Sequence, residues 1–223
     1  MKVYLDNAAT TMVRKEVVDA MIPAFTTYYG NPSSLHEYAR EAERLLDAAR
    51  KYVAAIINAK PDEIVFTGGG SESDNMALRG AVAANKKKGK HVITSAVEHH
   101  AVLYTLQAME REGLIDLTIL PVDEYAIVSA ESVANALRDD TVLVSIMFAN
   151  NEVGSINPIS EIGKICRDKG VLFHTDAVQA TGHVPIDVVK MNIDMLSISA
   201  HKFHGPKGVG VLYIRKGVRI PSL

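Results

Sequence analysis

Short apolar runs alternate with segments of helical periodicity over most of this chain, and that alternation restricts its possible folds more than any other feature. Strands are expected at residues 64–66, 91–94, 117–122, 142–148, 171–173, 195–198 and 209–214. Helices are expected between them, at residues 71–88, 100–112, 129–138 and 159–169. This order is typical of an α/β fold, in which helices cover both faces of a mostly parallel sheet.

Two further helices are expected before the sheet. Apolar side chains recur at helical spacing over residues 14–28. The second helix is expected to begin at a capping box of Ser34 and Glu37 and to carry one long apolar face. Residues 1–15 are expected to form an irregular arm, and residues 16–223 one large domain without an internal linker.

Composition and charge exclude several classes of protein. The formal net charge is −2, and the basic run Lys86–Lys88 falls at an expected helix end, so nucleic-acid binding is not expected. No run of about eighteen apolar residues occurs, and Asp6 comes too early for a signal peptide, so no membrane association is expected. The single cysteine, Cys166, excludes an intrachain disulfide and fits a reducing cytoplasm.

Polar clusters follow five of the expected strands, each where the strand ends. Ligands bind at the carboxyl ends of the strands in an open parallel sheet, so these clusters are expected to form one shared site. They are Gly68–Ser71, Glu98–His100, Asn150–Glu152, Asp176–Gln179 and Ser199–Lys202.

Lys202 is the central candidate for chemistry. A lysine on a rigid strand end can form a Schiff base with an aldehyde cofactor, and the neighbouring Ser199 and His201 can hydrogen-bond a phosphate on that cofactor. A solvated basic loop is the alternative interpretation of these three residues.

A glycine-rich turn, Thr67–Ser71, enters one of the expected helices. Free backbone N–H groups and the positive end of the helix dipole favour a phosphate there. The spacing matches neither a nucleotide P-loop nor a dinucleotide-binding motif. Glu72 and Asp74 would repel an anion unless they point away from it. A plain helix N-terminus capped by Ser71 is the alternative.

Four more polar residues at strand ends suit a flat pyridine cofactor. The Asp176 carboxylate can pair with a protonated pyridine nitrogen, which makes the ring of pyridoxal phosphate an electron sink, and Gln179 can reach the ring hydroxyl. His99 can stack on the ring and transfer protons near neutral pH, and Asn151 can bond the ring hydroxyl or a substrate carboxylate. Caps and turns are the alternative roles of Asp176 and Asn151.

A metal site is not expected, although four histidines fall in the same clusters. No cysteine or carboxylate ligand pattern accompanies them, and His100 is disfavoured because adjacent residues do not share a face. These histidines are His99, His100, His201 and His204.

Seven motifs occur in a fixed order along the chain. They are Tyr4–Thr11, Gly30–Ser34 with His36, Phe66–Asn75, Glu98–Ala101, Asn150–Gly154, Asp176–Gln179 and Ser199–Gly208. Together they resemble the pyridoxal-phosphate-dependent cysteine desulfurases, the NifS/IscS-like branch of the class V aminotransferase family. The resemblance runs from Tyr4 to about Arg215 and implies the large domain of the fold-type-I enzymes.

The resemblance implies a role for each candidate residue. Lys202 would hold the cofactor covalently and, with His99, move protons. Asp176 would face the pyridine nitrogen, and Gln179 and Asn151 the ring hydroxyl. The residues implied to bind the phosphate are Gly70, Ser71, Ser199 and His201. Ser71 replaces the threonine usual in the family and preserves its hydroxyl.

The resemblance also implies a reaction and its partners. L-cysteine would be converted to L-alanine, and the sulfur would pass to an enzyme persulfide for iron–sulfur cluster or thiocofactor assembly. A homodimer and sulfur-acceptor scaffold proteins would be the partners.

In that family the catalytic cysteine and the arginine that binds the substrate carboxylate lie further downstream than Leu223. The sequence is therefore expected to lack the C-terminal small domain, against which residues 1–15 would pack, and to be a truncated form. Cys166 stands on an apolar helix face and is expected to be structural. The alternatives are another class V activity, as in an aminotransferase or a selenocysteine lyase, and a non-catalytic cofactor-binding domain.

Overall fold

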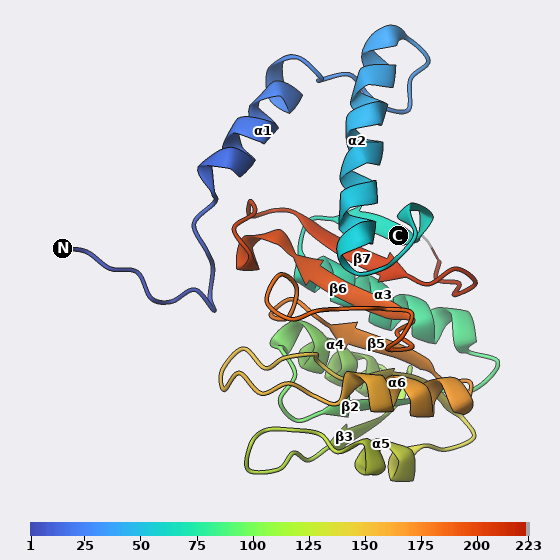
Figure 1. The fold of residues 1–223 in the computed structure, drawn as a ribbon. Helices are drawn as coiled ribbons and strands as arrows, with labels where there is room; N and C mark the ends of the chain where they lie inside the picture. Colours follow the sequence, from blue (N-terminus) through green and yellow to red (C-terminus); the bar gives the residue numbers. More distant parts are fainter. Residues whose placement is uncertain (222–223) are drawn as a thin grey trace.

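A computed structural model describes residues 1–221 and contains one seven-stranded sheet (Figure 1). The strands are β1 (Ile64–Thr67), β2 (His91–Ser95), β3 (Asp116–Leu120), β4 (Thr141–Ser145), β5 (Leu172–Asp176), β6 (Met195–Ser199) and β7 (Gly210–Ile214). Their spatial order is β1-β7-β6-β5-β4-β2-β3. β7 runs antiparallel to both of its neighbours, while the pairs from β6 to β3 are parallel. The expected α/β fold with a mostly parallel sheet is confirmed.

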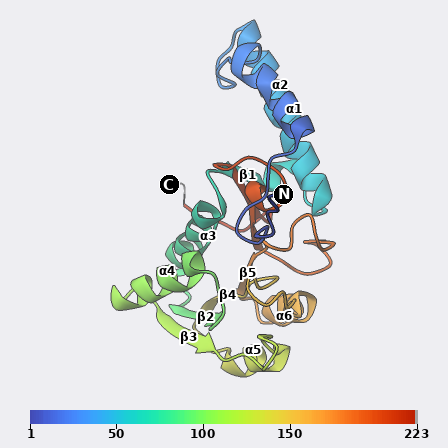
Figure 2. The same ribbon diagram turned by 90° about the vertical axis from the view of Figure 1, so that its left-hand side faces the viewer.

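Helices cover both faces of the sheet. α3 (Gly70–Asn85) and α4 (His100–Arg111) lie on one face, and α5 (Ala130–Ala136) and α6 (Ile159–Asp168) lie on the other (Figure 2). One buried cluster joins α3 and α4 to the sheet through residues such as Leu78 and Leu106. The other joins α5 and α6 to it through residues such as Val133 and Ile162. Burying one such side chain contributes roughly 1.5–3 kcal/mol, so the two clusters fix the strands that carry the site.

α1 (Lys15–Thr26) and α2 (Glu37–Ile56) extend away from the sheet (Figure 1). No side chain of α1 is buried, and α2 buries only three alanines. Phe25 is 71% exposed and Ile56 is 56% exposed, so much of the expected apolar faces stays uncovered by residues 1–221.

The expected capping box at the start of α2 is wrong. The His36 ring, not Ser34, caps this helix and accepts a 3.3 Å hydrogen bond from the backbone N–H of Ala39. Ser34 instead lies in a preceding turn, where its N–H donates to the carbonyl of Asn31. The helix begins at Glu37, so Ser34 lies too far before it to act as the N-cap.

Among the described residues, no helix combines the length and the apolar character that crossing a membrane requires.

Candidate active site

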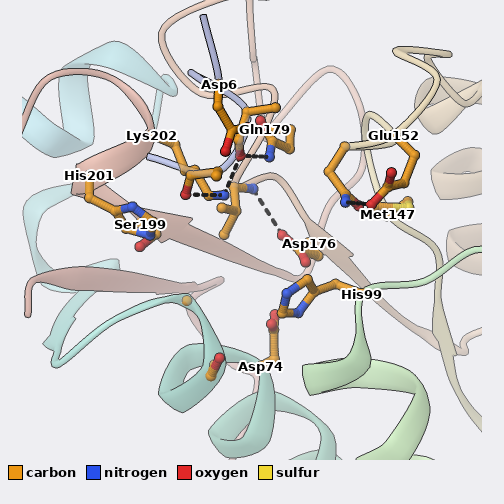
Figure 3. Close-up of a pocket in the computed structure, with 16 residues that line it drawn as sticks. Asp6, Asp74, His99, Met147, Glu152, Asp176, Gln179, Ser199, His201 and Lys202 are labelled. Carbon is orange, nitrogen blue, oxygen red and sulfur yellow. Dashed lines mark hydrogen bonds between the residues drawn. The ribbon is translucent and has the colours of Figure 1, made fainter. Parts of the chain in front are cut away.

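The polar clusters at the strand ends meet in one pocket of about 520 Å³ (Figure 3). All nine residues singled out from the sequence line it: Gly70, Ser71, His99, Asn151, Asp176, Gln179, Ser199, His201 and Lys202. They come from the ends of β1, β2, β4, β5 and β6, as the parallel topology requires. Asp6, Ala8, Ala9 and Asp74 also line the pocket, and sequence reasoning did not place them there.

Lys202 ends a single 3-10 turn, Ala200–Lys202, that directly follows β6. Its ε-amine donates hydrogen bonds to the carbonyl oxygens of Ala8 and Ala9. Burial lowers the pKa of this amine, and the charges of Asp176 and Asp6 oppose that shift. A lowered pKa increases the fraction of neutral amine, which is the nucleophilic form.

The N-terminal arm forms one wall of the pocket and is pinned to the segment around Lys202. The Thr11 hydroxyl donates to the carbonyl of His201 at 2.8 Å and accepts from the N–H of His204 at 2.7 Å. The Gln179 side chain donates to the carbonyl of Ala8 at 2.9 Å. These small and polar arm residues have no periodicity, so the sequence held no signal for this contact.

Asp176 is the last residue of β5 and is 5% exposed. Its Oδ1 accepts a 2.9 Å hydrogen bond from the N–H of Val178. Burial raises the pKa of this carboxyl, while that hydrogen bond and the nearby charges of His99 and Lys202 lower it. The carboxylate is thus placed on the pocket floor beside two groups that can carry positive charge.

His99 caps the N-terminus of α4. Its Nδ1 accepts a 3.1 Å hydrogen bond from the N–H of Ala101, so in the neutral ring the proton sits on Nε2. That tautomer can donate from Nε2 while the cap fixes the ring. His100 stacks on Tyr104 instead, with 4.4 Å between the ring centroids, and does not line this pocket.

The glycine-rich turn places the N-terminus of α3 against β6. The helix begins at Gly70 with Gly69 as the N-cap, so Ser71 is in the first turn and does not cap it. A Cβ on Gly70 would lie 2.8 Å from Cγ2 of Val178 and 3.4 Å from Cβ of Ser199. Backbone N–H groups therefore approach the pocket where a larger residue would not fit, which suits an anion.

Two further candidates complete this part of the pocket. The His201 ring contacts the Thr10 hydroxyl at 3.1 Å, and burial lowers the pKa of that ring, as do the charges of Lys202 and Lys207. Asn151 lies in the turn after β4, where its amide donates to Glu152 at 3.0 Å.

Glu72 and Asp74, the two acidic residues that follow the glycine-rich turn in α3, differ in their surroundings. Glu72 folds back and accepts a hydrogen bond from the N–H of Gly68. Asp74 does not point away from the site: it lines the pocket, is 1% exposed, and its Oδ1 has no hydrogen-bond partner. Burial, reinforced by the charge of Asp176, raises the pKa of Asp74 well above its usual range, and a hydrogen bond from Ser197 opposes that shift.

Comparison with known proteins decides the family. The model of the aminotransferase class-V family matches residues 3–221. The chain belongs to that family. Class V aminotransferases, including the cysteine desulfurases among them, depend on pyridoxal phosphate.

Several similar proteins are cysteine desulfurases by name. "Cysteine desulfurase IscS" of Methanosarcina thermophila is 58% identical over 99% of this chain and 54% of its own length. That of Clostridium botulinum (strain Kyoto / Type A2) is 56% identical over 100% of this chain and 56% of its own length. The chain therefore spans about half the length of the curated relatives that it matches.

Solved structures agree with the sequence comparison. A "NIFS-like protein" superposes with a TM-score of 0.96 at 43% identity, over 100% of this chain and 61% of its own. A structure titled "SspA in complex with cysteine" superposes with a TM-score of 0.96 at 41% identity, over 100% of this chain and 64% of its own.

Proposed function

We propose that this chain forms the pyridoxal-phosphate-binding part of a cysteine desulfurase, which converts L-cysteine to L-alanine and passes the sulfur to a thiol. The observation that carries the proposal is the convergence of Lys202, Asp176 and the N-terminus of α3 in one pocket. An amine of lowered pKa, a buried carboxylate and a cradle of backbone N–H groups are the three kinds of group that a phosphorylated pyridine aldehyde needs.

When bound, pyridoxal phosphate supplies an aldehyde that condenses with amines and a ring that withdraws electrons from the bonds of the bound amino acid. Lys202 would hold it covalently, and Gly70, Ser71, Ser199 and His201 would bind the phosphate. Asp176 would face the ring nitrogen, and Gln179 and Asn151 would bond the ring hydroxyl.

Two residues of this chain would move protons. The Lys202 amine, when released from the cofactor, can take a proton from the substrate and return one to the product carbon. His99, held by its Nδ1 cap, can donate and accept at Nε2, and its ring would stack on the bound cofactor. The arm carbonyls of Ala8 and Ala9 would steady the free amine between these steps.

The thiol that receives sulfur would not be Cys166. This residue is fully buried in α6, and burial raises the pKa of its thiol to about 12. A reactive cysteine requires exposure and a lowered pKa, so the acceptor would be supplied from outside this sequence. The same proposal includes a homodimer, sulfur-acceptor scaffold proteins and a cytoplasmic location.

The test begins with cofactor binding. The purified chain is mixed with pyridoxal phosphate, and we expect a visible absorbance band that resists dialysis and is absent in Lys202→Ala. Lys207→Ala, which changes an exposed lysine of the same segment, is the matched control and should keep the band. A folded chain without any band would contradict the proposal.

The second stage identifies the reaction. L-cysteine should perturb the band, and alanine should form when a cysteine-containing C-terminal part of a relative is supplied. Selenocysteine and pairs of amino acid and 2-oxoacid serve as competing substrates. Faster turnover of either would assign a different class V activity.

A further inference from the structure

A second buried carboxylate lies on the pocket wall beside the one expected to face the cofactor ring. Asp74 projects from α3 and Asp176 ends β5, and Figure 3 shows both on the same side of the pocket as His99. Their side chains line the same cavity, and the residues are 1% and 5% exposed. Two buried carboxylates that share one cavity cannot both be charged without a cation to compensate them.

The group nearest to Asp74 cannot supply that cation. His174 Nε2 lies 3.6 Å from Oδ1 of Asp74, beyond hydrogen-bond distance. Its ring is already held between Ser145, 2.9 Å from Nδ1, and Ser197, 3.1 Å from Nε2. Burial lowers the pKa of His174 to about 3, so the ring is neutral at physiological pH.

The surroundings of Asp176, in contrast, stabilise its charged form. The charges of His99 and Lys202 act on it, and the N–H of Val178 donates to its Oδ1. Among charged groups, Asp176 acts most strongly on Asp74 and raises its pKa, while a hydrogen bond from Ser197 lowers it. The surroundings therefore favour the charged form more at Asp176 than at Asp74.

We propose that Asp74 is a positioning residue that works as a neutral acid, so that the pair carries one negative charge and this charge sits on Asp176. The inference rests on the proposed function. It adds that Asp74 holds the proton of the pair, so that Asp176 is ionised and can face the pyridine nitrogen as a carboxylate. It also explains how an acidic residue is accommodated four positions after the start of the phosphate cradle.

The direct test needs no cofactor. Carboxyl carbons of aspartate are labelled with ¹³C in the purified chain, and the Asp74 and Asp176 signals are assigned with Asp74→Asn and Asp176→Asn. As the pH rises, we expect the Asp176 carboxyl to ionise first and the Asp74 carboxyl to keep its proton after Asp176 has ionised. An Asp74 signal that titrates before that of Asp176, or together with it, would overturn the proposal.

A second measurement uses the cofactor. Asp74→Asn keeps a neutral side chain of the same shape, so the pyridoxal phosphate Kd at pH 7.5 should change by less than about threefold, well under the tenfold that 1.4 kcal/mol represents. The pH midpoint of the absorbance band should also be unchanged. Asp74→Leu, which removes the polar group, should shift that midpoint. Ser73→Ala, at a buried neighbour outside the pocket, controls for disturbance of the helix start.

The outcomes separate the two proposals. If no variant and no parent chain binds pyridoxal phosphate, the proposed function fails while the carboxyl titration still decides the state of Asp74. If Asp74→Asn weakens binding more than tenfold while Ser73→Ala does not, Asp74 acts as an anion and the inference fails. Should Asp74→Asn not fold, Asp74→Leu assigns the Asp74 signal in its place.

Discussion

The ε-amine of Lys202 lies 3.0 Å from the carbonyl oxygen of Ala9, so the lysine after β6 is hydrogen-bonded to the N-terminal arm. The two residues are 193 positions apart in the sequence. A lysine held in this way is already aimed into the pocket, because the arm and the strand end converge on its amine. The attachment of the arm therefore matters for the site.

Thr11→Val is expected to loosen the arm. The substitution removes the buried hydroxyl that joins the arm to His201 and His204, and each broken hydrogen bond that leaves a buried group unpaired costs about 1–3 kcal/mol. Hydrogen exchange at the N–H of Thr11 and Arg14, which donate to the carbonyls of His201 and His204, should accelerate at least about tenfold. Thr26→Val, at an exposed threonine of α1, is the control, and equal protection in both variants would contradict this role of Thr11.

Gly70→Ala is expected to weaken phosphate binding. The added Cβ would overlap Cγ2 of Val178 at 2.8 Å, so the start of α3 must shift away from the Val178 side chain and carry its N–H groups with it. We expect the Kd for pyridoxal phosphate to rise by about tenfold or more, which corresponds to about 1.4 kcal/mol. Gly68→Ala is the matched control, because a Cβ there meets only the flexible end of Glu72. Equal affinities of the two variants would contradict phosphate binding at the start of α3.

Glu98→Gln is expected to stabilise the protein above neutral pH. Glu98 Oε1 accepts from the Ser95 hydroxyl and the N–H of Met147, and a glutamine carbonyl can keep both bonds. Burial raises the pKa of Glu98 to about 8 from an ordinary value of 4.5. The Glu98 carboxyl binds its proton more tightly in the folded protein than in the unfolded one. The free energy of unfolding therefore falls as the pH rises between those two values, by up to about 5 kcal/mol.

Urea unfolding at pH 5, 6.5 and 8 measures this effect. The advantage of Glu98→Gln over the parent should grow with pH across that range. Glu112→Gln, an exposed counterpart at the end of α4, should show no such trend. A constant difference between parent and Glu98→Gln would mean that the buried carboxyl ionises at its ordinary pH.

His174→Gln is expected to reduce the sensitivity of the fold to acid. The pKa of the buried ring is lowered to about 3, so the unfolded chain binds a proton that the folded chain refuses. Stability that His174 gives near pH 7 is therefore lost as the pH falls from about 6.5 towards 3. The variant should be less stable at pH 7, because Ser145 and Ser197 lose a partner, yet should lose less on acidification. His183→Gln, at an exposed histidine, should follow the parent curve.

The strand ends could be predicted from the sequence because the topology rule is simple. Once the apolar runs are recognised as parallel strands, the residues after them must meet at one edge, and Lys202, Asp176 and His99 do so. Element bounds differed from the expected ones by a few residues, because fraying and capping depend on local hydrogen bonds.

Other features of the fold and the site could not be predicted, because they depend on contacts between residues far apart in the sequence. The apolar periodicity of α1 and α2 was visible, but it cannot tell whether another element covers the face, and Phe25 is in fact exposed. The Ser34–Glu37 spacing matched a capping box, yet His36 took that role. The sequence left open whether Asp74 points away from the bound anion, because its burial at the pocket depends on how α3 packs on β5 and β6.

The position of β1 has a consequence for synthesis. β1 pairs with β7, so Ile64–Thr67 must wait for Gly210–Tyr213 before their backbone groups find partners. The glycine turn that follows β1 is tethered to the sheet by the same late event. On the ribosome, a nascent chain would complete its middle strands first and acquire the ability to capture a cofactor only after β7 had emerged.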